Sequence, residues 1–269
     1  MTSSERHLRI GQPRWDYSVQ RYKPDRDVFF EKGLFSILFL ACGRHTVTKR
    51  CLLSTIDAVS KSPTPVEWIF MENGNDEENY NFFQSLDLER KVVIRQKNYG
   101  INNAWNQMWQ ISRGEWCFVH ENDFENRMPN FDFLTTAKGI FEDCGDVGII
   151  QLRAAHDPCE NYGRGKPMYN PWSCSHEQNE LAGIKLLNHE GRGYHSLIGR
   201  NFYGFNNNPN LIAKKLYREC GFYPEAELGC DPAHGETLYQ EEVLKTECAI
   251  SHICKEIYYH VGQIKTKIV

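Results

Sequence analysis

Apolar residues come in short continuous runs through the first half of the chain, and amphipathic stretches separate these runs. The apolar runs are residues 35–41, 66–71, 91–96 and 115–120. Runs of this length are typical of strands buried on both faces of a parallel sheet. The stretches between them, residues 47–60, 78–86 and 98–112, have the spacing of helices. The pattern predicts an α/β fold with an open, doubly wound sheet and right-handed crossovers.

The second half of the chain has a less regular pattern. Residues 154–200 are rich in Gly, Pro, His, Asn and Tyr, and a long connection of this kind usually forms a lid or a substrate-binding wall. Around it the sequence predicts helices at 131–144, 211–219 and 235–246, and strands at 147–153, 249–253 and 256–260.

The periodicity also predicts where the folded domain begins. Residues 1–33 show no periodic pattern, which is typical of a loosely attached N-terminal arm. No internal repeat or low-complexity tract divides the remainder. We therefore expect a single catalytic domain at 34–269, with one half at 34–126 and the other at 127–269.

An acidic cluster follows the apolar run at 115–120. Glu121 and Asp123 come directly after this run. The carboxyl ends of parallel strands meet at one edge of a sheet, and ligands bind there. Carboxylate oxygens suit Mg²⁺ or Mn²⁺, and a diphosphate can complete the coordination shell. An acidic loop that binds nothing has the same composition, so the neighbouring loops must decide between the two interpretations.

Polar loops follow two other predicted strands at the same edge. Glu72 and Asn73 lie in a turn-rich loop that can accept hydrogen bonds from a base and a ribose. Gly100 permits a close backbone approach at a helix start, where N–H groups favour an anion. Asn98 and Asn106 flank it, although Asn is also common in turns and caps. These loops predict a nucleotide site. The sequence contains neither the glycine fingerprint of dinucleotide-binding folds nor a Walker loop.

Composition limits the class of protein. The chain is 41% hydrophobic and 25% charged, as in an ordinary globular protein, and no apolar run approaches the ~20 residues that cross a bilayer. The net charge of −4 argues against general attraction to nucleic acid. The N-terminus has no apolar signal core.

Ten scattered cysteines without a Cys-x-x-Cys motif indicate reduced thiols and a cytoplasmic location. One group of cysteines and histidines has an alternative interpretation. A zinc site would use His156, Cys159, Cys174 and His176.

In their order and spacing, these motifs resemble the GT-A glycosyltransferases, particularly the family-2-type inverting enzymes, over residues 35–262. The resemblance is carried by Arg44, Glu72-Asn73-Gly74, Asn98, Gly100, Ala104, Asn106, Glu121, Asp123, Asn208-Pro209, Glu236, His260 and Gly262. It implies a Rossmann-like open mixed sheet flanked by helices. The half at 34–126 would bind the nucleotide-sugar, and the half at 127–269 would bind the acceptor.

The resemblance also implies roles for individual residues. The nucleobase would contact Glu72 and the adjacent Asn73, and Arg44 would lie near the diphosphate or the base. The nucleotide-sugar cleft would be lined by Asn98, Gly100 and Asn106. A Mn²⁺ or Mg²⁺ ion would bind Glu121, Asp123 and His260. The expected reaction is transfer of a sugar, with inversion, from a nucleotide-sugar, expected to be a UDP-sugar.

The catalytic base stays open at this stage. Glu236 falls where the family places an acidic residue at a helix start, but the usual Glu-Asp pair is missing there. Glu241 and Glu242 lie five residues later and are the alternative. Arg153, after a predicted strand, is a further candidate for the donor or acceptor pocket. The metal motif also departs from the usual Asp-x-Asp, since its first position is Glu121.

Two other classes of protein compete with this interpretation. A nucleotidyltransferase also places paired carboxylates on a metal, but it normally has a glycine-rich basic loop after the first strand. A non-catalytic module that binds glycans or nucleic acid would not need the two carboxylates. Within the transferase hypothesis, the acceptor could be a glycan, a protein or hydroxymethylated DNA, and the oligomeric state is undetermined. Trp105 and Trp109 are expected in the core rather than under a sugar.

Overall fold

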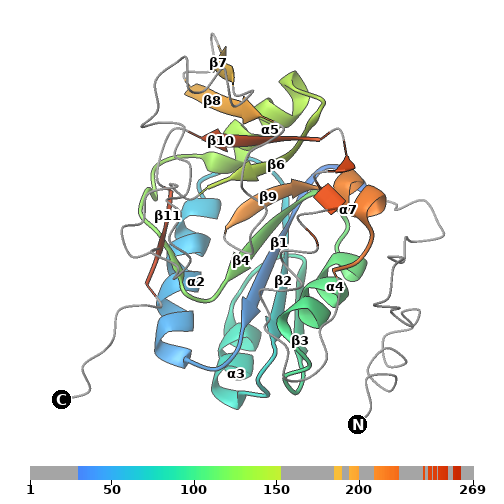
Figure 1. The fold of residues 1–269 in the computed structure, drawn as a ribbon. Helices are drawn as coiled ribbons and strands as arrows, with labels where there is room; N and C mark the ends of the chain where they lie inside the picture. The colour runs from blue at the N-terminus through green and yellow to red at the C-terminus, as the bar shows by residue number, and fades with distance from the viewer. Residues whose placement is uncertain are drawn as a thin grey trace, which may run out of the picture.

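The computed structural model describes residues 30–152, 185–189, 194–199, 209–223, 239, 242–243, 245–246, 248–253 and 257–261. Its first half confirms the predicted alternation of strands and helices (Figure 1). The elements are β1 (Glu31–Ala41), α2 (His45–Val59), β2 (Val66–Glu72), α3 (Glu77–Ser85), β3 (Lys91–Arg95), α4 (Ile101–Ile111) and β4 (Gly114–Glu121). β1 pairs in parallel with both β2 and β4, and β2 pairs in parallel with β3.

The second half adds the elements that widen the sheet and close the site. They are β5 (Phe124–Asn126), α5 (Phe133–Asp143), β6 (Val147–Gln151), β7 (Lys185–His189), β8 (Tyr194–Gly199), β9 (Asn210–Ala213), α7 (Lys214–Cys220), β10 (Ala249–Ile253) and β11 (Tyr258–His260). The main sheet has nine strands in the order β3-β2-β1-β4-β9-β6-β10-β8-β7. β11 and β5 form a separate two-stranded sheet. The mixed sheet flanked by helices is the predicted architecture.

Two predictions for the second half were wrong. Residues 211–213, expected in a helix, form β9, because they lie antiparallel between β4 and β6. Leu211 then packs on one face of the sheet and Ile212 on the other. Residues 185–199, expected in an irregular connection, contain the antiparallel pair β7 and β8. In the predicted helix at 235–246, the described residues 239, 242–243 and 245 are helical.

Strand alternation divides the apolar side chains between two faces of the sheet. On one face, Phe35, Ile37 and Phe39 of β1 pack in one cluster with side chains of α2, α3 and α5. On the other face, Leu38 and Leu40 belong to a cluster that includes side chains of α4 and α7. The helices therefore cover both faces of the sheet (Figure 1). None of the helices described is both long and apolar enough to cross a bilayer.

Candidate functional site

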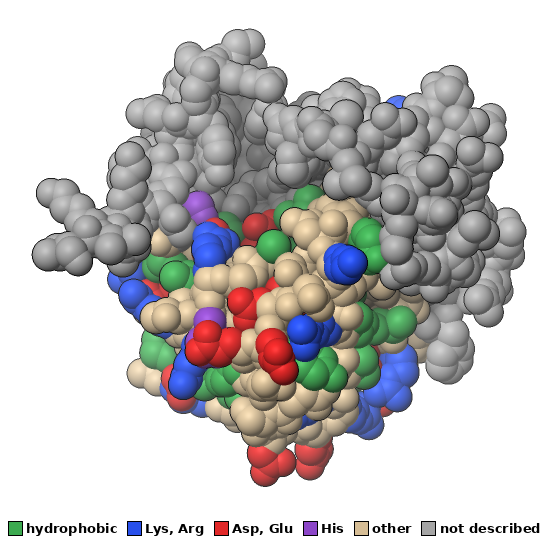
Figure 2. Space-filling view, turned by 90° about the horizontal axis from the view of Figure 1, so that it is seen from below, with side chains coloured by type: hydrophobic (Ala, Val, Ile, Leu, Met, Phe, Trp, Pro, Cys, Tyr) green, Lys and Arg blue, Asp and Glu red, His purple; other side chains and the backbone are tan. Residues whose placement is uncertain are grey.

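The order of the strands reverses between β1 and β4. From β1 the chain proceeds outward through β2 and β3, whereas β4 returns to pair with the other side of β1. Open α/β sheets bind ligands at the carboxyl ends of strands at such a reversal. Arg44 follows β1 and Asp123 follows β4 at this edge. Figure 2 is a view from below, onto this edge. In its described part, acidic, basic and His side chains lie among hydrophobic side chains and the tan of the backbone and other side chains.

Asp123 is the centre of a charged cluster at this edge. Its side chain is buried, with 7% of the residue exposed. Oδ2 accepts a hydrogen bond from Arg44 Nη2 at 3.1 Å and lies 3.0 Å from His260 Nε2. Burial raises the pKa of the Asp123 carboxyl, but the hydrogen bonds and charges of His260 and Arg44 outweigh burial and lower this pKa. Asp123 is therefore a carboxylate at neutral pH.

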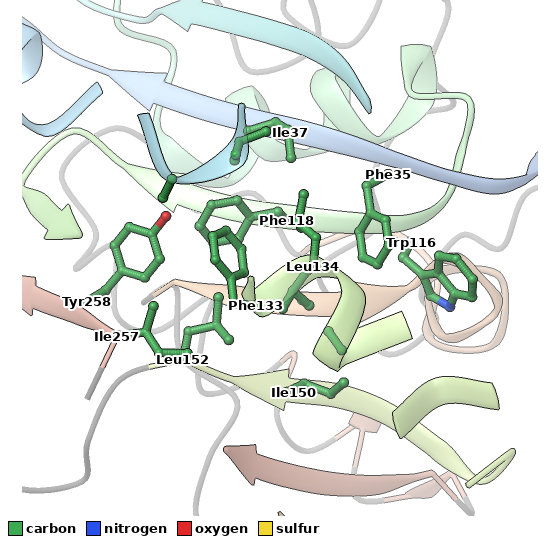
Figure 3. Packing of buried hydrophobic residues seen from close by; sticks show 14 of the residues in the cluster. Phe35, Ile37, Trp116, Phe118, Phe133, Leu134, Ile150, Leu152, Ile257 and Tyr258 are labelled. Atoms are coloured by element: carbon green, nitrogen blue, oxygen red, sulfur yellow. The ribbon is translucent and has the colours of Figure 1, made fainter. Parts of the chain in front are cut away.

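The two-stranded sheet of β5 and β11 brings His260 to Asp123. His260 pairs with Phe124, and Val261 N donates to Asp123 O at 2.8 Å. The imidazole of His260 stacks on the Phe124 ring, with 4.8 Å between centroids. Two residues earlier, Tyr258 lies among the core residues near Phe118 (Figure 3). Because residues i and i+2 of a strand share a face, burial of Tyr258 fixes the direction of His260.

The loop after β1 directs Arg44 across to β4. Gly43 and Arg44 have φ values of 63° and 54°, so the chain turns through two left-handed residues before α2. Arg44 Nη2 then reaches Asn122 Oδ1 at 2.8 Å as well as Asp123. Asn122 Nδ2 in turn donates to Thr48 Oγ1 at 2.7 Å. Sequence reasoning missed Asn122, whose place inside the acidic motif was the available signal.

The structure brings together two of the three predicted metal ligands. Glu121 lies opposite Leu40 in the sheet, on the face that α4 covers, whereas Asp123 lies against His260. Accordingly, no three His, Cys, Asp or Glu side chains gather as a metal site among the residues described. Among the residues that the structure describes, Asp123 Oδ1 and His260 Nδ1 are buried atoms without a hydrogen-bond partner. One carboxylate and one imidazole fit a Mg²⁺ or Mn²⁺ site that substrate phosphates complete.

Glu72 ties the loops after β1 and β2 together. The residue is fully buried. Oε1 accepts from the backbone N–H of Gly74 at 2.7 Å and of Gly43 at 3.3 Å, and Oε2 accepts from Asn79 Nδ2 at 2.8 Å. Burial raises the pKa of Glu72, and these hydrogen bonds offset part of that rise. Glu72 therefore shapes the loop beside Arg44, and its direct contact with a nucleobase stays a prediction.

Asn73 joins the loop after β2 to the loop before α4. Its Nδ2 donates to Gly100 O at 3.2 Å and to Asn98 Oδ1 at 3.4 Å. Asn98 Oδ1 also accepts from Gly100 N at 2.9 Å. Gly100 has a φ of 96°, which favours glycine at this helix start. The structure thus brings Asn73, Asn98 and Gly100 together, as the sequence predicted, at the ends of β2 and β3.

Comparison of the whole chain with solved structures identifies the fold. A crystal structure of S. aureus TarS residues 1–349 matches with a TM-score of 0.58 and 15% identity, over 84% of this chain and 60% of that one. TarS is a GT-A-type glycosyltransferase. This chain has the GT-A fold. The TarS complex with UDP-GlcNAc matches with a TM-score of 0.55 and 13% identity, over 84% of this chain and 57% of that one.

The similarity to TarS extends to the fold and not to the sequence. The TarS complex with UDP matches with a TM-score of 0.56 and 14% identity, over 84% of this chain and 59% of that one. This chain spans about 60% of the length of these structures. No protein-family model and no curated protein sequence matches it. The similarity therefore shows the GT-A fold, and support for an activity comes from the residues of the site.

Asn106 has a different place in this GT-A fold from the one expected. The residue is fully buried, Nδ2 donates to Tyr223 O at 2.9 Å, and Oδ1 accepts from Tyr223 N at 2.8 Å. These two bonds hold the segment after α7 against α4, and a contact of Asn106 with the donor stays a prediction. Trp105 and Trp109 are both fully buried, which confirms that they belong to the core.

The remaining predicted site residues fall mostly outside the described part of the GT-A fold. Glu242 is described, and its Oε1 accepts from Lys245 Nζ at 2.8 Å. The predicted residues that lie outside the described part of the chain are Arg153, Glu236, Glu241, His156, Cys159, Cys174 and His176. Their roles, including the zinc alternative, stay predictions.

Proposed function

We propose that this chain is a glycosyltransferase that moves a sugar from a UDP-sugar to an acceptor hydroxyl with inversion. The observation that carries this proposal is the cluster of Arg44, Asp123 and His260 at the strand reversal of a GT-A sheet. The TarS complexes with UDP and UDP-GlcNAc support the class of donor. The ligand-binding edge of such a sheet is where this cluster lies.

The reaction forms one bond and breaks one bond at the anomeric carbon of the donor sugar. The acceptor oxygen attacks this carbon as its proton passes to a carboxylate base. The bond from the sugar to the phosphate oxygen breaks, and UDP leaves with the electron pair. Arg44, whose side chain is 47% exposed, has a permanent charge directed to this edge and would stabilise the departing diphosphate.

A divalent cation would be held by Asp123 and His260, with phosphate oxygens completing its shell. When bound, Mn²⁺ or Mg²⁺ supplies a Lewis acid that neutralises the leaving diphosphate. Glu121, the last residue of β4, stays a predicted third ligand. For the base we keep Glu236 as the proposal, with Glu241 and Glu242 as alternatives. A positioned base contributes about 10²- to 10⁴-fold.

Incubation of the protein with a panel of UDP-sugars and Mn²⁺ tests the proposal. We expect slow release of UDP even without acceptor, and this release should fall when the metal is chelated. Turnover that depends on pyrophosphate would instead indicate a nucleotidyltransferase. Binding of glycan or nucleic acid without any donor turnover would indicate a non-catalytic module.

The acceptor and the cellular location need separate experiments. The three acceptor classes are a glycan, a protein and hydroxymethylated DNA, and sugar transfer from a labelled donor to each distinguishes them. We also keep a cytoplasmic location as a proposal. The location of a tagged full chain after cell fractionation tests it directly.

A further inference from the structure

A chain of carboxamide side chains runs from α4 to the proposed donor site. Gln107 Nε2 donates to Gln96 Oε1 at 2.7 Å, and Gln96 Nε2 donates to Asn73 Oδ1 at 2.7 Å. Asn73 Nδ2 then donates to Asn98 Oδ1 at 3.4 Å. All three hydrogen bonds run in the same direction. Each amide therefore accepts from the previous one and donates to the next.

The first and last members of this carboxamide chain set its direction. Gln107 Nε2 also donates to Asn103 Oδ1 at 2.7 Å, which fixes the Gln107 amide group toward α4. At the other end, Gly100 N donates to Asn98 Oδ1 at 2.9 Å. Asn98 Oδ1 is therefore an acceptor inside the loop. Hydrogen bonds that follow one another in one direction polarise and strengthen each other.

Asn98 consequently presents its N–H₂ group to the exposed side. Asn98 is exposed, and the acceptor of Nδ2 is Cys42 Sγ at 3.7 Å. Sulfur is a weak acceptor, so a carbonyl oxygen of a ligand can replace it. This amide lies at the ends of β2 and β3, on the side of β1 away from Asp123. A nucleotide-sugar whose diphosphate lies at Asp123 would extend its nucleoside toward the Asn98 amide.

We propose that Gln107 and Gln96 are positioning residues that hold Asn98 with its N–H₂ group toward the nucleobase, which selects uracil over cytosine. This inference rests on the proposed function. Uracil has a carbonyl oxygen at its fourth ring position, which accepts a hydrogen bond. Cytosine has an amino group there, which only donates. The N–H₂ group of Asn98 can therefore donate a hydrogen bond to uracil. Facing cytosine, it would meet another donor, and both groups would be left unpaired.

The substitution Gln107→Glu tests the direction of the carboxamide chain. It replaces the first donor with a carboxylate, which only accepts, so the Gln96 amide is driven to rotate and no longer donates to Asn73, which weakens the positioning of Asn98. We expect the ratio of UDP to CDP affinity, measured by calorimetry with Mn²⁺, to fall at least about tenfold. This corresponds to about 1.4 kcal/mol. Gln110→Glu places the same charge on an exposed position of α4 and should leave the ratio unchanged.

Gln96→Leu provides a second variant, because it breaks the middle link without adding charge. We expect it to lower the same ratio even if Gln107→Glu does not fold. An unchanged ratio in the folded variants, with a wild type that prefers UDP, would overturn the carboxamide proposal and leave the transferase proposal intact. A wild type that binds neither nucleotide would overturn both. General destabilisation would weaken UDP and CDP binding equally, so the ratio separates positioning from stability.

Discussion

Arg44 Nη2 lies 3.1 Å from Asp123 Oδ2, although the two residues are 79 positions apart in the sequence. The contact spans the boundary between β1 and β4, where the strand order reverses. Burial alone would raise the pKa of the Asp123 carboxyl, but the contacts with His260 and with Arg44 lower it. The fold therefore keeps a charged acid at the edge where a nucleotide diphosphate would bind.

Asp123→Ala should abolish metal-dependent turnover of the donor while the fold stays intact. The substitution removes the carboxylate that contacts both Arg44 and His260. UDP release with Mn²⁺, together with the circular dichroism spectrum, checks this expectation. Glu125→Ala is the matched control, because Glu125 lies two residues away and pairs with Arg50 rather than with the cluster. Normal turnover by the Asp123 variant would refute the assignment.

His260→Ala should weaken the activating effect of Mn²⁺. Loss of a protein ligand is expected to raise the Mn²⁺ concentration for half-maximal turnover at least about tenfold, in line with the 10- to 100-fold losses that follow removal of weaker supporting contacts. A Mn²⁺ titration at saturating donor measures it. Tyr259→Ala changes the adjacent residue of β11, whose ring packs under Arg127, and serves as the control. Equal Mn²⁺ dependence in both variants would exclude His260 as a ligand.

Glu236→Gln should reduce sugar transfer about 10²- to 10⁴-fold while UDP binding is retained, because a base acts in the chemical step and not in donor binding. Single-turnover transfer and calorimetry with UDP separate the two effects. Glu241→Gln and Glu242→Gln are the comparison variants. If one of these loses transfer and Glu236→Gln does not, the base belongs to that later pair.

Asn106→Ala should lower the free energy of unfolding by about 2–6 kcal/mol. It removes both partners of the Tyr223 backbone N–H and C=O in a fully buried position, and each unpaired group costs about 1–3 kcal/mol. Urea denaturation measures the change. Gln110→Ala, exposed on the same helix, should stay within about 0.5 kcal/mol of wild type. A similarly small change for Asn106→Ala would show that the Tyr223 contact is dispensable.

Stability should depend on pH through His120. Burial lowers the pKa of this fully enclosed imidazole from 6.5 to about 3. The unfolded chain therefore binds the proton first, so the contribution of His120 is complete above pH 6.5 and declines as pH falls toward 3. The decline approaches about 1.4 kcal/mol per pH unit.

Urea denaturation of wild type and His120→Phe between pH 7 and pH 5 measures this slope. The variant should lose it, whatever its stability at pH 7, since phenylalanine does not titrate. Parallel pH profiles for the two proteins would show that His120 is not responsible.

The sequence alone determined the alternating elements of the first half. Its apolar runs are long enough to be buried strands, and local periodicity distinguishes them from the helices between them. It also predicted that Asp123, Asn73 and Gly100 lie at one edge of the sheet, because polar residues that follow buried parallel strands meet there. Local pattern was sufficient wherever neighbours in the sequence are also neighbours in the sheet.

Only the tertiary structure decided the features that depend on distant pairing. β9 is a strand because it pairs antiparallel with β4 on one side and with β6 on the other, although its sequence also suits a helix start. Asp123 follows the turn after β4, and its partners Arg44 and His260 come from distant parts of the chain. Asn106 bonds to the backbone of Tyr223, 117 positions away, which no local pattern predicts. The physical reason is that a side chain's partners are fixed by packing across the sheet, which sequence spacing does not encode.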